Sequence, residues 1–169
     1  MKYFLYVSLL LIIVYSCSSA NQTSINHPAK GKTLSPSPGF NGNFEKALFK
    51  ASLDIRNQHL SGFLLIKKTA DSTYRIVFAN EIGMTLFDLG FQESQFKVHY
   101  IFEPMKKKIL LRLFENDFKR LIFDIERSNS NPLMKTIFQY EGQKGQIPRR
   151  ISISNPVIKM NMELTLISQ

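Results

Sequence analysis

The sequence predicts a mainly β domain of the α+β class: a curved antiparallel sheet of about eight strands, an incomplete half-barrel, with one long amphipathic helix packed on its concave face. Three observations predict this fold. Apolar residues recur at every second position through most of the chain after residue 44, which is typical of strands with one buried face. Short polar pieces separate these runs, and one stretch over residues 103–127 changes to the period of a helix.

The first part of the domain is predicted to form consecutive hairpins. In "ALFKASLDIR", residues 47–56, alternate positions are apolar, so one face of this long strand is buried. Similar segments follow at residues 60–68, 73–80, 84–91 and 95–102. The pieces "TADS", "NEIG" and "QES" between them are rich in turn formers, which indicates an antiparallel meander.

The segment "EPMKKKILLRLFENDFKRLIFDIER" is predicted to be the helix. Pro104 is acceptable in its first turn, and one apolar stripe runs along it, formed by Leu110, Phe114, Phe118, Leu121 and Ile125. A first turn that holds Lys106, Lys107 and Lys108 is unfavourable next to the positive end of the helix dipole. These lysines are therefore candidates for contact with an anion or a phospholipid headgroup, with a solvated helix end as the alternative.

The chain after the helix returns to strands. Alternate residues from Met134 to Tyr140 form one face, "EGQKG" is predicted to turn, and a short strand contains Ile151 and Ile153. The last strand, over residues 158–166, has Ile, Met or Leu at every second position.

The expected width of the sheet leads to a functional hypothesis. Eight strands about 4.8 Å apart make a sheet roughly 34 Å wide, whereas a helix with its side chains is about 10–12 Å across. Such a sheet either curls and leaves an apolar groove for an acyl chain, or closes into a self-filled core. The groove candidates are Phe49, Leu53, Leu64, Ile66, Ile76, Phe78, Met84, Leu86, Val98, Tyr100, Leu110, Phe114, Phe118, Met160, Met162 and Leu164.

The N-terminus resembles a bacterial lipoprotein signal. Lys2 precedes an apolar run over residues 3–15, shorter than the roughly 20 residues that span a bilayer. Val14 and Ser16 precede Cys17 as in a lipobox, which implies a diacylglycerol and an N-acyl chain on Cys17. We expect a signal peptide over residues 1–16, the lipidated Cys17 and a flexible tether over 17–43, and one domain over 44–169. Apart from the covalent lipid, the sequence predicts no cofactor and no metal site.

The net charge of +9 indicates an anionic partner or a solvated basic surface. Export argues against nucleic acid, and anionic lipid at a membrane is the partner that fits. No enzyme is predicted, because no nucleophile elbow, P-loop or His-Glu-x-x-His motif is present. His59 and His99 are expected at the surface. Asp54 and Asp88 are the candidate carboxylates, and Asp88, which shares a face with Met84 and Leu86, needs a partner such as Arg75 or Lys67.

This order of a lipobox, a tether, a meander with a long first strand, an amphipathic helix and returning strands resembles the outer-membrane lipoprotein receptors and periplasmic lipoprotein carriers of the LolA/LolB-like fold. The resemblance covers about residues 44–167, and the stretch over residues 60–91, from "LSGFLLIKK" to "YRIVFANEIGMTLFDLGF", is similar to envelope lipoproteins with that fold. It implies a half-barrel that holds acyl chains of lipids or lipoproteins, in bacterial envelope trafficking. We expect the periplasmic face of the outer membrane, because Ser18 and Ser19 lack the aspartate of inner-membrane retention. The alternative is a non-catalytic interaction or scaffold lipoprotein with a closed core.

Overall fold

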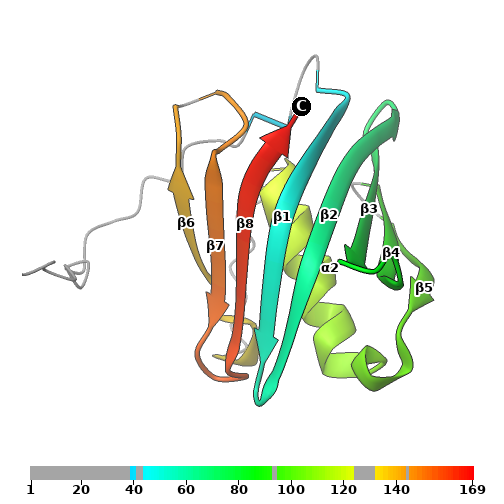
Figure 1. Cartoon of the computed structure of the whole chain (residues 1–169), viewed down its shortest axis with the longest axis vertical. Coiled ribbons are helices and arrows are strands. Elements are labelled where there is room, and N and C mark those ends of the chain that lie inside the picture. Colours follow the sequence, from blue (N-terminus) through cyan, green and yellow to red (C-terminus); the bar gives the residue numbers. More distant parts are fainter. Residues whose placement is uncertain (1–38, 41–43, 93–94, 124–131, 144) are drawn as a thin grey trace, which may run out of the picture. The chain divides into compact units, whose positions relative to one another are not determined.

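A computed structural model of the chain describes residues 39–40, 44–92, 95–123, 132–143 and 145–169. These residues form an eight-stranded antiparallel sheet, one α-helix and two short 3-10 helices (Figure 1). The predicted signal peptide, Cys17 and nearly all of the predicted tether lie outside the described residues. Within the described part, no helix combines the length and apolar character needed to cross a membrane.

The strands lie in the spatial order β5-β4-β3-β2-β1-β8-β7-β6, so the first and last of the described strands, β1 and β8, pair at the middle of the sheet. Their bounds are β1 (Lys46–Ile55), β2 (Gln58–Ala70), β3 (Thr73–Asn80), β4 (Thr85–Gln92), β5 (Phe96–Ile101), β6 (Ile137–Glu141), β7 (Arg150–Asn155) and β8 (Met160–Ser168). Every neighbouring pair is antiparallel. The prediction of a mainly β domain with an antiparallel meander is confirmed.

Alternation along each strand separates an inner face, which packs on the helix, from an outer face. In β1, Phe49 and Leu53 are fully buried while Lys50 between them is exposed, as a strand with a side-chain period of two requires. The register aligns large inner residues into rows across the sheet, such as Phe49 opposite Leu64 and Leu64 opposite Phe78. The core is therefore continuous from strand to strand.

The helix α2 (Lys108–Phe123) differs from the prediction in length and in pattern. It has 16 residues, because Glu103–Met105 form a separate 3-10 turn, η2, and residues 124–131 with Ile125 are not described. The first α-helical hydrogen bond runs from the Leu111 N–H to the Lys107 carbonyl, so Lys106 and Lys107 precede the helix. Burial also extends beyond one apolar stripe to Asp117 and Lys119, so α2 is not a long amphipathic helix.

The sheet curls around α2. In a flat sheet, β4 and β6 would lie six strand spacings apart, about 29 Å. One helix nevertheless contacts both strands: the Phe114 ring lies 5.2 Å from the Phe87 ring of β4, and the Arg120 guanidinium lies 4.6 Å from the Phe138 ring of β6. Figure 1 shows α2 lying behind the central strands on one face of the sheet. The arrangement is consistent with a curved half-barrel.

Aromatic side chains fill the end of the fold at which α2 finishes. Phe44 packs on Phe40 and on Tyr74, and Tyr74 in turn packs on Phe123 of α2. The buried Tyr74 hydroxyl donates a hydrogen bond of 2.9 Å to the Phe40 carbonyl. Phe40, which lies within the predicted tether, is fully buried, so the described core includes a residue that precedes residue 44.

Between α2 and β6 lies η3 (Pro132–Met134), a 3-10 turn whose Leu133 carbonyl accepts a hydrogen bond of 2.9 Å from the side-chain amide of Asn155 at the end of β7.

Candidate functional site

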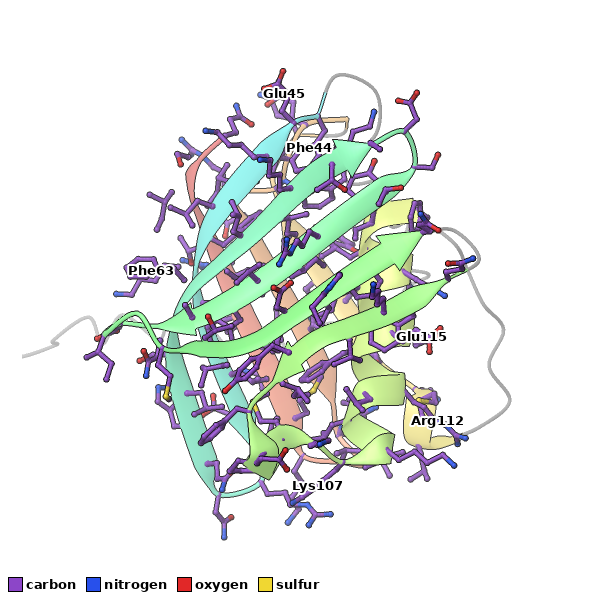
Figure 2. The ribbon with its side chains drawn as sticks, turned by 90° about the vertical axis from the view of Figure 1, so that its right-hand side faces the viewer. Phe44, Glu45, Phe63, Lys107, Arg112 and Glu115 are labelled. Carbon is purple, nitrogen blue, oxygen red and sulfur yellow. The ribbon has the colours of Figure 1, made fainter. Side chains whose placement is uncertain are left out.

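A cavity of about 240 Å³ opens at the opposite end of the fold, where α2 begins. It lies between the β1–β2 turn, η2, the first turn of α2 and the β7–β8 turn, and it is lined by Ile55, Arg56, Asn57, Gln58, Pro104, Met105, Lys107, Ile109, Leu110 and Ile158. Its floor is apolar, because Ile55, Met105, Leu110 and Ile158 are all at most 9% exposed. Figure 2 shows the two ends of the fold, with Phe44 at the aromatic end and Lys107 at the end with the cavity.

Two tight turns hold the walls of the cavity. Arg56 adopts a left-handed conformation, with φ of 55°, and its N–H donates to the Lys159 carbonyl at 2.8 Å, which ties the β1–β2 turn to the β7–β8 turn. Asn155 is fully buried, and its side-chain oxygen accepts hydrogen bonds of 3.1 Å from the N–H groups of Val157 and Ile158. Asn155 therefore fixes the position of Ile158 against the cavity.

The rim of the cavity is cationic. Arg56 and Lys107 both line it, and within the described part of the chain neither lies within ion-pairing distance of a carboxylate. Of the other two candidate lysines, Lys106 pairs with Glu103 at 3.0 Å and Lys108 is the first residue of α2. An apolar floor with a positive rim is chemically suited to an amphiphile with an acyl chain and an anionic head.

Most of the groove candidates lie in the core instead of lining an opening. Leu110 is the one that lines the cavity. The following are buried among themselves and against α2: Phe49, Leu53, Leu64, Ile66, Ile76, Phe78, Leu86, Phe114, Phe118, Met160, Met162 and Leu164. The inner face of the described sheet is thus filled by the protein's own side chains.

Three groove candidates are exposed. Met84 lies in the β3–β4 turn, and a register shift between Asp88 and Leu89 places Tyr100 opposite Asp88 but Val98 opposite Leu89. The shift puts Tyr100 on the outer face, so the expectation that Val98 and Tyr100 share an inner face is wrong. A β-bulge of this kind inserts one residue without changing the composition of the strand, so period counting does not reveal it.

The carboxylates that we singled out lie on the outer face. Asp88 accepts two hydrogen bonds from the Arg75 guanidinium, at 2.8 and 2.6 Å, which confirms one of the two partners predicted for it. These bonds from Arg75 hold the pKa of Asp88 below its usual value. Asp54 accepts from His59 at 2.6 Å, both at the surface. In the described ranges, no group of three or more His, Cys, Asp or Glu side chains is placed to hold a metal ion.

One further carboxylate, which we did not predict, is buried between α2 and the β6 side of the sheet. Asp117 is 2% exposed, and its Oδ2 has no hydrogen-bond partner among the described residues. Burial raises the pKa of Asp117 to about 7, although Thr136, Asn116 and Arg120 act in the opposite direction. Asp117 lies four residues after Leu113 and four before Leu121, so helix geometry places it beside the apolar stripe, but a stripe defined by apolar residues alone leaves out an ionisable side chain.

Sequence reasoning missed most of the cavity. Arg56 and Asn57 form the β1–β2 turn and Gln58 begins β2, while Met105 and Ile158 lie in turns that the sequence pattern places in the helix and in the last strand. The polar pair Arg56-Asn57 is the one signal that marks the β1–β2 turn. Nothing local indicates that this turn meets η2 across the end of the sheet.

No protein-family model matches the chain, and a search of curated proteins finds no match.

Proposed function

We propose that the protein is a membrane-anchored lipoprotein on the periplasmic face of the bacterial outer membrane, and that its domain binds an acyl chain of a lipid or lipoprotein at the end cavity. The observation that carries the proposal is the combination of a buried apolar floor with Arg56 and Lys107 at the rim. An acyl chain would displace water from the floor, and a carboxylate or phosphate would lie between the two cations.

The size of the cavity limits what it takes in. Pockets that enclose a small ligand usually measure about 300–1,000 Å³, and this cavity measures about 240 Å³. The filled inner face leaves no continuation for a longer chain in the described residues. The proposal is therefore that the cavity holds one segment of an acyl chain while the rest stays in a membrane or on the partner.

The anchor completes the proposal. Cys17 would carry the diacylglycerol and N-acyl chains, and the segment over residues 17–38 would join it to the domain. The protein is proposed to bind and not to catalyse, and it requires no cofactor besides its covalent lipid.

A second candidate function is an envelope interaction or scaffold lipoprotein with a closed core. The burial of nearly all the groove candidates favours it. In that case β5 or β6, the edges of the described sheet, would pair with another envelope protein.

Uptake of a fluorescent fatty acid separates the two functions. The protein is the full chain with Cys17→Ser, which removes the anchoring thiol. We expect saturable uptake, and Ile109→Trp, which fills the cavity from the first turn of α2, is expected to weaken it about tenfold or more, equivalent to about 1.4 kcal/mol. The matched control Ile137→Trp changes an exposed residue of β6 and should leave uptake unchanged.

Absence of uptake by the parent chain, or equal uptake by Ile109→Trp, would favour the closed-core function. The anchor is tested separately, by the mass of Cys17 peptides from membranes: a peptide without added acyl groups would contradict lipidation.

A further inference from the structure

A row of cations crosses the outer face of the sheet. Lys46 of β1 is directly opposite Lys67 of β2, Lys67 is opposite Arg75 of β3, Arg75 is opposite Gly90 of β4, and Gly90 is opposite Lys97 of β5. The four basic side chains are exposed. The row extends over four strand spacings, about 19 Å. Like charges directly opposite each other destabilise a sheet, so this row carries a cost that a bound anion would remove.

The row is not neutralised within the described part of the chain. Arg75 is paired with Asp88, whose side chain is 14% exposed. For Lys46, Lys67 and Lys97, no carboxylate of the described residues lies within ion-pairing distance. The row therefore keeps a net positive charge even with the Arg75–Asp88 pair intact.

The row ends at a hollow of about 260 Å³ on the outer face. It forms where Gly90 has no side chain, and it is lined by Thr73, Gly90, Phe91, Gln92, Gln95, Lys97 and His99. His99 leans over it, with its Nε2 atom 2.9 Å from the position that a Cβ of Gly90 would take. The ammonium, imidazole, hydroxyl and amide groups around the hollow are suited to the oxygens of a phosphate.

Two exposed aromatic residues lie on the same outer face. Phe63 is opposite Lys50 and is 42% exposed, and Tyr100 is opposite Asp88 and is 46% exposed. Figure 2 shows the Phe63 side chain directed away from the sheet. Basic residues combined with exposed aromatics are typical of surfaces that lie in the headgroup region of a membrane.

We propose that the outer face of β1–β5 docks on an anionic phospholipid surface, with one headgroup phosphate in the Gly90 hollow and the remaining headgroups along the row from Lys46 to Lys97. This inference rests on the proposed membrane anchor, because the anchored segment enters the sheet at β1, where Lys46 begins the row. A membrane fits better than a small anion, since a single phosphate cannot contact cations spread over about 19 Å.

The test compares two vesicle compositions. The full lipidated chain is reconstituted into vesicles of phosphatidylcholine alone, or with phosphatidylglycerol added, and the rate of acetylation of each lysine is measured by mass spectrometry. We expect Lys67 and Lys97 to react about fivefold more slowly on the anionic vesicles, and this protection to fall as salt is added. Exposed Lys135 and Lys159, away from the row, serve as internal controls and should react equally on both.

Variants of equal charge provide the matched comparison. In the Cys17→Ser chain, which lacks the anchoring thiol, Lys67→Gln with Lys97→Gln should weaken binding to anionic vesicles roughly 30-fold, at about fivefold per lysine, whereas Lys135→Gln with Lys159→Gln should change it little. Equal acetylation of Lys67 and Lys97 on both vesicles, or equal losses in both double variants, would overturn the docking surface. Full protection by inorganic phosphate without anionic lipid would also overturn it, by identifying a small-anion site.

Failure of the anchor gives a different result. Flotation with phosphatidylcholine vesicles measures the anchor alone, and its absence counts against the proposed function. The difference in the acetylation of Lys67 and Lys97 between anionic and neutral vesicles still tests the docking surface by itself.

Discussion

The buried carboxylate of Asp117 should make the free energy of unfolding depend on pH. The pKa of Asp117 is about 7 in the folded protein, whereas in the unfolded chain it returns to the ordinary value of 3.8. Between these two values the folded state holds a proton that the unfolded state has released, so the free energy of unfolding falls as the pH rises. Each pH unit is worth about 1.4 kcal/mol, and the full loss between about pH 4 and pH 7 is roughly 4 kcal/mol.

The substitution Asp117→Asn removes the titration while it preserves the size of the side chain. We expect the variant to gain roughly 4 kcal/mol relative to the parent between pH 4 and pH 8, with the gain complete above pH 7. The difference between the two proteins isolates Asp117. Other groups titrate in both proteins. One is Asp88: its lowered pKa stabilises the fold at pH values above the ordinary pKa of aspartate, and this stabilisation is lost as the pH falls through the lowered pKa.

Urea unfolding followed by circular dichroism measures both free energies at each pH, and it suits a chain without tryptophan. Glu141→Gln is the control, because Glu141 is 66% exposed in its pair with Arg150 and should change stability by less than about 1 kcal/mol. A difference between Asp117→Asn and the parent that stays constant within about 1 kcal/mol over this pH range would refute the argument from burial.

Three further substitutions test the packing by the same urea measurement. Gly62→Ala should lower the free energy of unfolding by about 3 kcal/mol or more, because the new Cβ would lie 2.0 Å from a backbone carbonyl oxygen of β3. Gly83→Ala has open space around it and a φ of 86°, so it should cost about 1 kcal/mol, and equal costs for the two variants would contradict the close approach at Gly62. Asn155→Ala should cost about 2–4 kcal/mol and also weaken fatty-acid uptake, since the Leu133 carbonyl and the N–H groups of Val157 and Ile158 lose their hydrogen-bond partner. Normal uptake would show that the β7–β8 turn keeps its position without the Asn155 side chain. Phe118→Ala should cost about 3–5 kcal/mol as a core truncation, and a cost below about 1 kcal/mol would indicate that the core is loosely packed.

The proposed end cavity and the proposed docking surface use different parts of one architecture. The cavity lies where α2 begins and the aromatic cluster closes the other end, while the row of cations runs along the outer face near the start of β1. A domain held by its anchor with this outer face on a membrane would keep the cavity at the far end of β1 and open to a partner.

The strands of the meander and the order in which they pair could be predicted from the sequence. Alternation of apolar and polar residues is a local property, so the buried face of β1 and of β8 could be predicted residue by residue. The apolar stripe of α2 could be predicted for the same reason, and Leu110, Phe114, Phe118 and Leu121 are all buried. The requirement of Asp88 for a cation was also local chemistry, and Arg75 provides it.

The curl of the sheet and the position of the end cavity depend on contacts between segments that are far apart in the sequence. The curl that brings β4 and β6 to one helix depends on twist and close approach summed over many strands, and no single segment encodes it. The end cavity and the burial of Asp117 arise where segments distant in sequence meet. Each depends on neighbouring residues that the periodicity of one segment does not identify. The cation row is of the same kind: each lysine alternates outward as its strand predicts, and the register alone aligns them.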